Sequence, residues 1–212
     1  MSGGYEILSL DEIETATHRD SNLIPVRHLL GYRAAGVNAW RADAGGQLIP
    51  PHDEDSDHEE LYVVVRGRAT FTVGDETSDL PAGALVFVPP GVMRTAVAAE
   101  DGTIVFVVGA SVGEPFRAGG WDTYAVAEEL RRSGREPEGR AEIERLVAAS
   151  PDYWATTYNA GCWEALAGNP DAAFEYLRRA QELAPEEVAP YLREDGDLDS
   201  LRDDPRFEEL LG

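Results

Sequence analysis

The hydrophobic periodicity of this chain changes near residue 118, and this change constrains the fold more than any other feature. Before it, short stretches rich in Val, Phe, Tyr and Thr alternate with Gly, Pro and Asp, a pattern typical of antiparallel strands joined by turns. We therefore expect residues 1–118 to form a β-barrel or sandwich. The expected strands lie within residues 23–31, 36–43, 59–67, 68–76, 83–91, 94–102 and 102–110.

From residue 119 onward the pattern becomes helical. Apolar residues recur three to four positions apart, and Gly, Pro and Asn-Pro breakers separate the segments. The acidic tail carries four spaced apolar residues that predict a capping helix, and the Gly- and Pro-bearing residues 112–120 predict a linker. We therefore expect an α+β chain of two domains, with residues 119–212 all-α. The expected helical segments are 121–132, 141–150, 153–168 and 171–184, and the tail residues are Leu198, Leu201, Phe207 and Leu210.

The charge balance excludes some classes of partner. The chain has 18 arginines, no lysine and 40 acidic residues, which gives a net charge of −22. Nucleic acids and anionic membranes bind through a basic excess that this sequence lacks. Without lysine, Schiff-base chemistry is excluded.

The sequence also predicts a cytoplasmic location. The longest apolar runs, such as residues 104–110, are far shorter than the roughly 20 residues that span a bilayer. The acidic amino terminus does not resemble a secretory signal. Cys162 is the single cysteine, so no intrachain disulfide can form, which fits a reducing compartment.

Two of the four histidines lie beside a glutamate at the start of an expected strand. If residues 58–66 are extended, His58, Glu60 and Tyr62 share one face of that strand. His52 approaches from the end of the preceding strand. Imidazole and carboxylate groups together suit zinc, iron, nickel or manganese, so His52, His58 and Glu60 are candidate metal ligands.

Residues 36–110 resemble the cupin superfamily. Gly46, His52, Glu60 and Gly67 match its first motif, and the residues Gly83, Pro89 and Gly91 match its second. The resemblance implies a small jelly-roll barrel whose internal pocket usually holds a metal and a small organic ligand. It also implies a homodimer, because cupin barrels often form dimers.

The chain departs from the cupin pattern at three positions. The second histidine of the first motif is absent, since Asp53 and Glu54 follow His52. In the second motif Arg94 stands where the family has a metal-binding histidine, and Ala98 stands where it has an asparagine. A guanidinium cannot coordinate a cation, so the four-ligand set of the family is incomplete.

Three interpretations of Arg94 stay open. Arg94 faces Glu60 across the barrel as an ion pair, or it points into the pocket and holds a carboxylate or phosphate of a ligand. In the third, a divalent transition metal binds His52, His58 and Glu60 while Arg94 turns toward substrate. Trp40 and Tyr62 are candidates for an aromatic pocket wall. The candidate ligand-binding residues are thus Arg94, Glu60, Tyr62, Trp40 and His52.

Residues 155–185 resemble a single tetratricopeptide repeat. Small residues at Gly161, Ala173 and Ala180 let two helices approach closely, and Pro185 matches the closing proline. One such repeat cannot bury its apolar face alone. We therefore expect a compact helical bundle docked on the barrel or on a second subunit, or alternatively a groove that receives a partner peptide.

Together these features favour a cupin-type protein that binds a small anionic molecule in the barrel and uses its helical domain for assembly or partner contact. The alternative is a metal-dependent cupin enzyme of isomerase, lyase or dioxygenase type that uses His52, His58 and Glu60. A second alternative is a scaffold whose barrel is filled by side chains. No catalytic residue is identified by the sequence.

Overall fold

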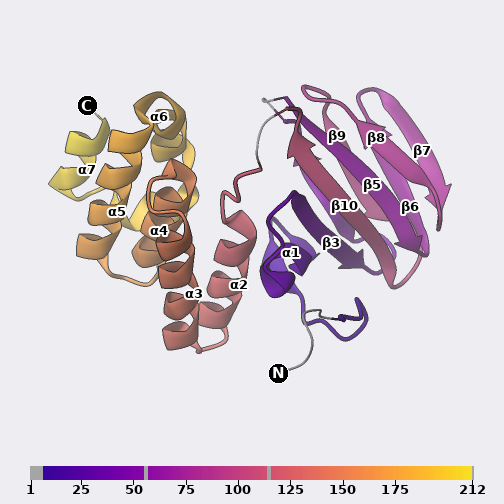
Figure 1. Cartoon of the computed structure of the whole chain (residues 1–212), viewed down its shortest axis with the longest axis horizontal. Coiled ribbons are helices and arrows are strands. Elements are labelled where there is room, and N and C mark those ends of the chain that lie inside the picture. The colour runs from indigo at the N-terminus through magenta and orange to yellow at the C-terminus, as the bar shows by residue number, and fades with distance from the viewer. Residues whose placement is uncertain (1–6, 55–56, 114–115, 212) are drawn as a thin grey trace. The chain divides into compact units, whose positions relative to one another are not determined.

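The chain folds into two compact units, residues 1–118 and 119–212 (Figure 1). A computed structural model describes residues 7–54, 57–113 and 116–211. Each unit has hydrophobic clusters of its own, around Ala39 and Ile104 in the first and around Phe174 and Trp163 in the second. None of the helices within the described ranges is long and apolar enough to cross a membrane.

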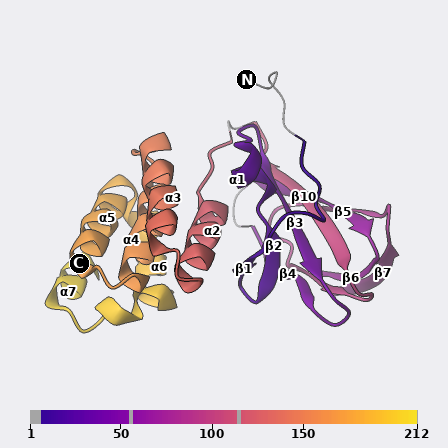
Figure 2. The same cartoon turned by 90° about the horizontal axis from the view of Figure 1, so that it is seen from below.

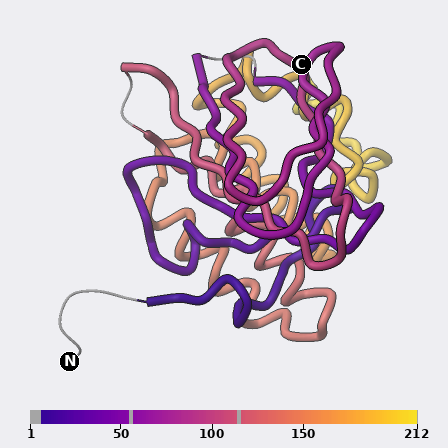
Figure 3. The backbone as a smooth tube through the Cα atoms, turned by 90° about the vertical axis from the view of Figure 1, so that its right-hand side faces the viewer, coloured from indigo at the N-terminus to yellow at the C-terminus, as the bar shows by residue number. Residues whose placement is uncertain are grey.

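The first unit contains two antiparallel sheets, which Figure 2 shows from below and Figure 3 traces as a tube coloured from indigo to magenta. In order across the first sheet lie β1 (Ala16–His18), β2 (Ser21–Ile24), β3 (Gly36–Ala42), β10 (Thr103–Ser111), β5 (His58–Arg66) and β8 (Leu85–Val88). Across the second lie β4 (Gln47–His52), β9 (Arg94–Ala98), β6 (Arg68–Val73) and β7 (Glu76–Pro81). The ring of Tyr62 on β5 contacts the ring of Phe71 on β6, so the two sheets pack face to face.

Alternation along two strands decides which side chains enter the space between the sheets. On β5, Glu60 and Tyr62 are buried, whereas Leu61 between them is exposed. On β9, Arg94 and Ala96 are buried. Because successive side chains of a strand point to opposite faces, Glu60 and Arg94 point toward each other from opposite sheets.

The expected strand at residues 23–31 is wrong from Pro25 onward. Strand β2 ends at Ile24, and the short helix α1 (Val26–Leu30) follows. Pro25 suits this position, because a proline at a helix start loses no hydrogen bond through its missing N–H. Its carbonyl accepts a bond from the backbone N–H of Leu29.

Strand β7 was not expected, since residues 76–81 lack an alternating apolar pattern. The strand lies at the edge of its sheet and most of its residues are exposed, so apolar side chains are not required there. The predicted linker and the acidic turn before β5 include residues 114–115 and 55–56, which lie outside the described residues.

The second unit is entirely helical. It contains α2 (Trp121–Arg132), α3 (Glu136–Ala149), α4 (Trp154–Leu166), α5 (Pro170–Leu183), α6 (Pro185–Glu194), the 3₁₀ helix η1 (Gly196–Leu201) and α7 (Pro205–Leu211). Helices α4 and α5 pack closely because Gly161 has no side chain. A Cβ atom there would lie 2.7 Å from Cγ of Leu177.

The single predicted capping helix in the tail is instead two short elements, η1 and α7. Pro205 begins α7, as proline favours the first position of a helix. The four apolar tail residues are all buried, in one cluster with α4 and α5, as their spacing indicated. They are Leu198, Leu201, Phe207 and Leu210.

Candidate functional site

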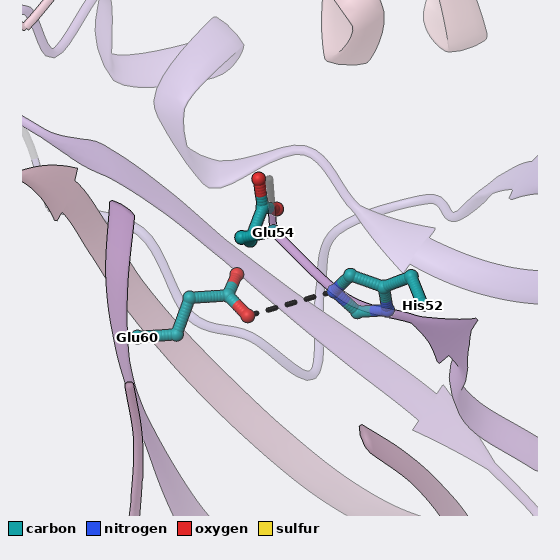
Figure 4. Close-up of side chains that lie close together, drawn as sticks. All are labelled: His52, Glu54 and Glu60. Carbon is teal, nitrogen blue, oxygen red and sulfur yellow. Dashed lines mark ion pairs between the residues drawn. The ribbon is translucent and has the colours of Figure 1, made fainter. Parts of the chain in front are cut away.

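Glu60 is the centre of a cluster of polar side chains in the first unit. Its Oε2 atom lies 3.5 Å from Nε2 of His52 and 3.3 Å from Nε of Arg94. The hydroxyl of Tyr62 donates a hydrogen bond to the same oxygen. Figure 4 shows the imidazole of His52 facing this carboxylate, with Glu54 close to both.

Strand pairing explains why residues distant in sequence meet here. His52 and Arg94 are directly paired residues of β4 and β9, so their backbones are neighbours in the second sheet. Glu60 and Tyr62 come from β5 in the first sheet, two residues apart and on one face. The cluster therefore spans both sheets of the sandwich.

Arg94 is completely buried, with 0% of its surface exposed. Its Nη1 donates to the carbonyl oxygen of His52 at 3.4 Å, and its Nε faces Glu60 as an ion pair without hydrogen-bond geometry, whereas Nη2 has no partner. A buried donor without an acceptor costs free energy, because it has lost its hydration without replacement. The guanidinium can therefore donate further hydrogen bonds to an acceptor placed beside it.

The charges in the cluster stabilise one another. Burial alone would raise the pKa of Glu60, but hydrogen bonds from His52 and Tyr62 and the charge of Arg94 lower it overall. Burial opposes a charge on His52, yet its contacts with Glu60 and with the Pro50 carbonyl raise the pKa of the imidazole. We conclude that Glu60 is ionised and that its neighbours favour a positive charge on His52.

Glu54 brings a second carboxylate to the same place. Burial and the charge of Glu60 raise its pKa. Single ligand atoms of His52, Glu54 and Glu60 all lie within 4.8 Å of one another. Arg94 balances one of these two carboxylates, so a further proton or cation among them would offset the remaining negative charge.

The tautomer of His52 determines what its inward nitrogen can do. Nδ1 lies 2.7 Å from the carbonyl oxygen of Pro50. Because a carbonyl only accepts, Nδ1 carries the hydrogen and donates it. Nε2 then presents either a lone pair for a cation or a second proton for Glu60.

Four of the sequence-predicted site residues come together, namely His52, Glu60, Tyr62 and Arg94. His58 is not part of the group of possible metal ligands that the structure brings together. Its imidazole lies over Gly109, where a Cβ atom would overlap its Nε2. Cγ of Glu60 would lie 3.2 Å from the same Cβ position, so the side chains of His58 and Glu60, which share a face of β5, both approach Gly109.

Glu54, which the sequence analysis did not list as a ligand, completes the group of possible metal ligands with His52 and Glu60. It is two residues after His52, where the first cupin motif has its second histidine. A carboxylate is also a metal ligand, so this spacing was a signal that sequence reasoning could have used.

Trp40 lies away from the cluster. It pairs with Val105, which in turn pairs with Val64 of β5. Val64 is four residues from Glu60, which corresponds to about 13 Å along a strand. The ring of Trp40 instead contacts that of His18, with 6.1 Å between ring centroids.

Comparisons with known proteins agree with this architecture. A family model described as "Cupin domain" matches residues 40–109. An uncharacterized protein of Streptomyces coelicolor is 39% identical over 84 residues, which cover 39% of this chain and 74% of that protein.

Solved structures with a similar fold include KdgF from Halomonas sp., at 18% identity and a TM-score of 0.42, covering 54% of this chain and 96% of that one. A cupin protein from Bacteroides fragilis has 23% identity and a TM-score of 0.40, covering 55% of this chain and 93% of that one. The sandwich, the two motifs and the family match lead to one conclusion: through its first unit, this chain belongs to the cupin superfamily.

Proposed function

We propose that the barrel binds a small anionic organic molecule and that Arg94 is its anchor. The observation that supports this proposal is the buried guanidinium, whose Nη2 has no partner and whose Nε meets Glu60 only as an ion pair without hydrogen-bond geometry. The planar, forked donors of arginine match the two oxygens of a carboxylate or the oxygens of a phosphate. An anion beside Arg94 would satisfy donors that the protein alone leaves unpaired.

The charges of the cluster limit when such an anion can bind. Glu54 and Glu60 together carry more negative charge than Arg94 neutralises while His52 is uncharged. A proton on His52 brings the sum to zero, and a divalent cation would bring it to about +1. The proposed anion therefore binds best together with a proton or a cation.

A second candidate is a metal-dependent cupin enzyme, and the convergence of His52, Glu54 and Glu60 favours it. These residues fit a divalent cation, because Nε2 of His52 can present a lone pair. Among the contacts within the described chain, no hydrogen bond reaches Oε1 of Glu60. One nitrogen and carboxylate oxygens suit manganese, iron or zinc.

When bound, such a cation would act as a Lewis acid toward an anionic substrate. The chain's own residues would position the substrate and the ligand carboxylate. Arg94 would orient the anion, and Tyr62 would hold the Glu60 carboxylate in place through its hydrogen bond. The substrate would then determine whether such an enzyme is an isomerase, a lyase or a dioxygenase.

For the second unit we retain the proposal of a tetratricopeptide-like domain that contacts a partner or a second copy. The close α4–α5 pair supports it, since Gly161, Ala173 and Ala180 lie where the repeat requires small residues. A homodimer in the cytoplasm remains the proposed state of the protein.

The anion proposal is tested by adding malonate, or its neutral isostere malonamide, to the full chain with and without Mn²⁺. We expect malonate and not malonamide to raise the melting temperature of the barrel, with a larger effect when Mn²⁺ is present. In Arg94→Met the effect disappears, whereas the matched control Arg68→Met, at a half-exposed arginine, retains it. Equal responses to malonate and malonamide would refute the proposal and favour a scaffold with a filled barrel.

The metal candidate needs a separate measurement. Isothermal titration with Mn²⁺ should show one site per chain that Glu54→Gln weakens strongly, while His58→Asn leaves it unchanged. Loss of binding in His58→Asn, with Glu54→Gln unaffected, would restore the ligand set expected from the sequence.

A further inference from the structure

Helix α6 has an aromatic and acidic face that the barrel function does not explain. Its centre is Tyr191, which is 50% exposed. The inner part of this ring packs against Trp154 and Tyr158 of α4, with ring centroids 5.7 and 5.6 Å apart. Tyr191 is thus held in place by its neighbours while its outer part meets solvent.

Acidic residues flank Tyr191 along the helix. Glu187 precedes it by four residues and Glu194 follows it by three, so all three lie on one face of α6. We call these three residues the Tyr191 face. Both glutamates are exposed, and no ion pair joins either of them to another residue in the described part of the chain.

No positive charge shares this face. Arg193 is the single basic residue of α6. It follows Tyr191 by two residues, which places it about 160° away around the helix. The Tyr191 face therefore combines the electron-rich surface of a fixed aromatic ring with two unneutralised carboxylates.

We infer that the Tyr191 face binds a basic peptide segment of a partner protein, through an arginine or lysine seated on the Tyr191 ring. A cation over an aromatic ring is attracted by the ring's quadrupole, and adjacent carboxylates add hydrogen bonds and charge. The inference rests on the partner role proposed above for the second unit, and it is independent of the barrel ligand.

Charge complementarity selects this occupant over others. Residues 121–212 carry 10 arginines and 22 acidic residues, and residues 1–120 carry 8 arginines and 18 acidic residues. A second copy would therefore bring mostly negative charge to a negative face, and nucleic acid would do the same. A basic segment is the partner that this field attracts.

The test uses the full chain and a fluorescent peptide of alternating arginine and glycine, with binding measured by anisotropy at low salt. We expect Glu187→Gln with Glu194→Gln to weaken binding about fivefold, as two exposed ion pairs would give. The matched control is Glu208→Gln with Glu209→Gln, which removes the same charge from exposed positions on α7. This control should change binding less than twofold.

The ring is tested separately from the charge. Tyr191→Phe keeps the aromatic face and should bind as the parent does, whereas Tyr191→Leu keeps an apolar side chain and should weaken binding severalfold. The inference would be overturned if the two glutamate double variants lost peptide affinity equally, or if Tyr191→Leu bound the peptide as tightly as the parent. Either result would indicate diffuse electrostatic attraction. Arg94→Met should leave peptide binding unchanged, so failure here and failure of the barrel proposal give different results.

Discussion

Replacement of Arg94 by methionine should destabilise the barrel, because it removes one member of a buried ion pair. Methionine keeps most of the aliphatic stem, so the change isolates the guanidinium. Glu60, only 9% exposed, would then have to bury its charge with Tyr62 and His52 as the remaining donors.

The expected cost follows from two opposing effects. Deleting one partner of a buried pair typically costs about 3–5 kcal/mol. Nη2 of the guanidinium has no partner, and removing it recovers about 1–3 kcal/mol of lost hydration. We therefore expect a net destabilisation of about 2 kcal/mol. The double variant with Glu60→Gln should lose less than the sum of the single variants.

Native-state hydrogen exchange of the full chain, with a chelator present, measures this cost in the barrel separately from the helices. Amides of β5 and β9 should exchange about 30-fold faster in Arg94→Met, which corresponds to a destabilisation of about 2 kcal/mol. Arg68→Met, at an arginine paired with Asp79 on the surface, should change them little. Unchanged exchange in Arg94→Met would refute the buried pair.

Three further predictions concern pH, metal and the helical unit. Because contacts with Glu60 raise the pKa of His52 above its unfolded value of about 6.5, the stabilisation is complete below that pH and is lost as the pH rises through the folded pKa. Barrel melting temperatures in chelator should therefore fall as the pH rises above about 6.5, and His52→Asn should remove that slope. Elemental analysis after dialysis against Mn²⁺ should find less metal in Glu54→Gln than in the parent; equal amounts would exclude Glu54 as a ligand. Gly161→Val should destabilise the helical unit by about 1–3 kcal/mol in urea, because its side chain would overlap Leu177, and an unchanged midpoint would contradict the close α4–α5 packing.

Local patterns in the sequence predicted the parts of the fold that depend on one element at a time. The alternation in residues 58–66 placed Glu60 and Tyr62 on one face, and the buried pattern of β5 agrees. The 3.6-residue periodicity predicted α2 over its full length. Spacing within the second cupin motif singled out Arg94, and one of its three interpretations had it facing Glu60; the two side chains are in contact.

Features that depend on contacts between elements were not predictable in this way. The turn from β2 into α1 depends on Pro25 and on packing against β3, although apolar residues continue through it. The proximity of Glu54 to His52 and Glu60, and the position of the His58 imidazole above Gly109 on a neighbouring strand, both depend on contacts between strands. The register between β5 and β10 brings these residues together, and a short sequence segment does not indicate the register of a strand with its neighbour.

The most direct test of the account is whether the guanidinium of Arg94 lies inside the sandwich beside Glu60. Two-dimensional ¹H–¹⁵N NMR of the arginine Nε–H groups, with Arg94→Lys to assign the signal, measures this in solution. The account predicts that the Arg94 Nε–H exchanges slowly with water and shows an Overhauser contact to the Tyr62 ring. An Arg94 signal that exchanges as fast as those of surface arginines and shows no such contact would contradict it.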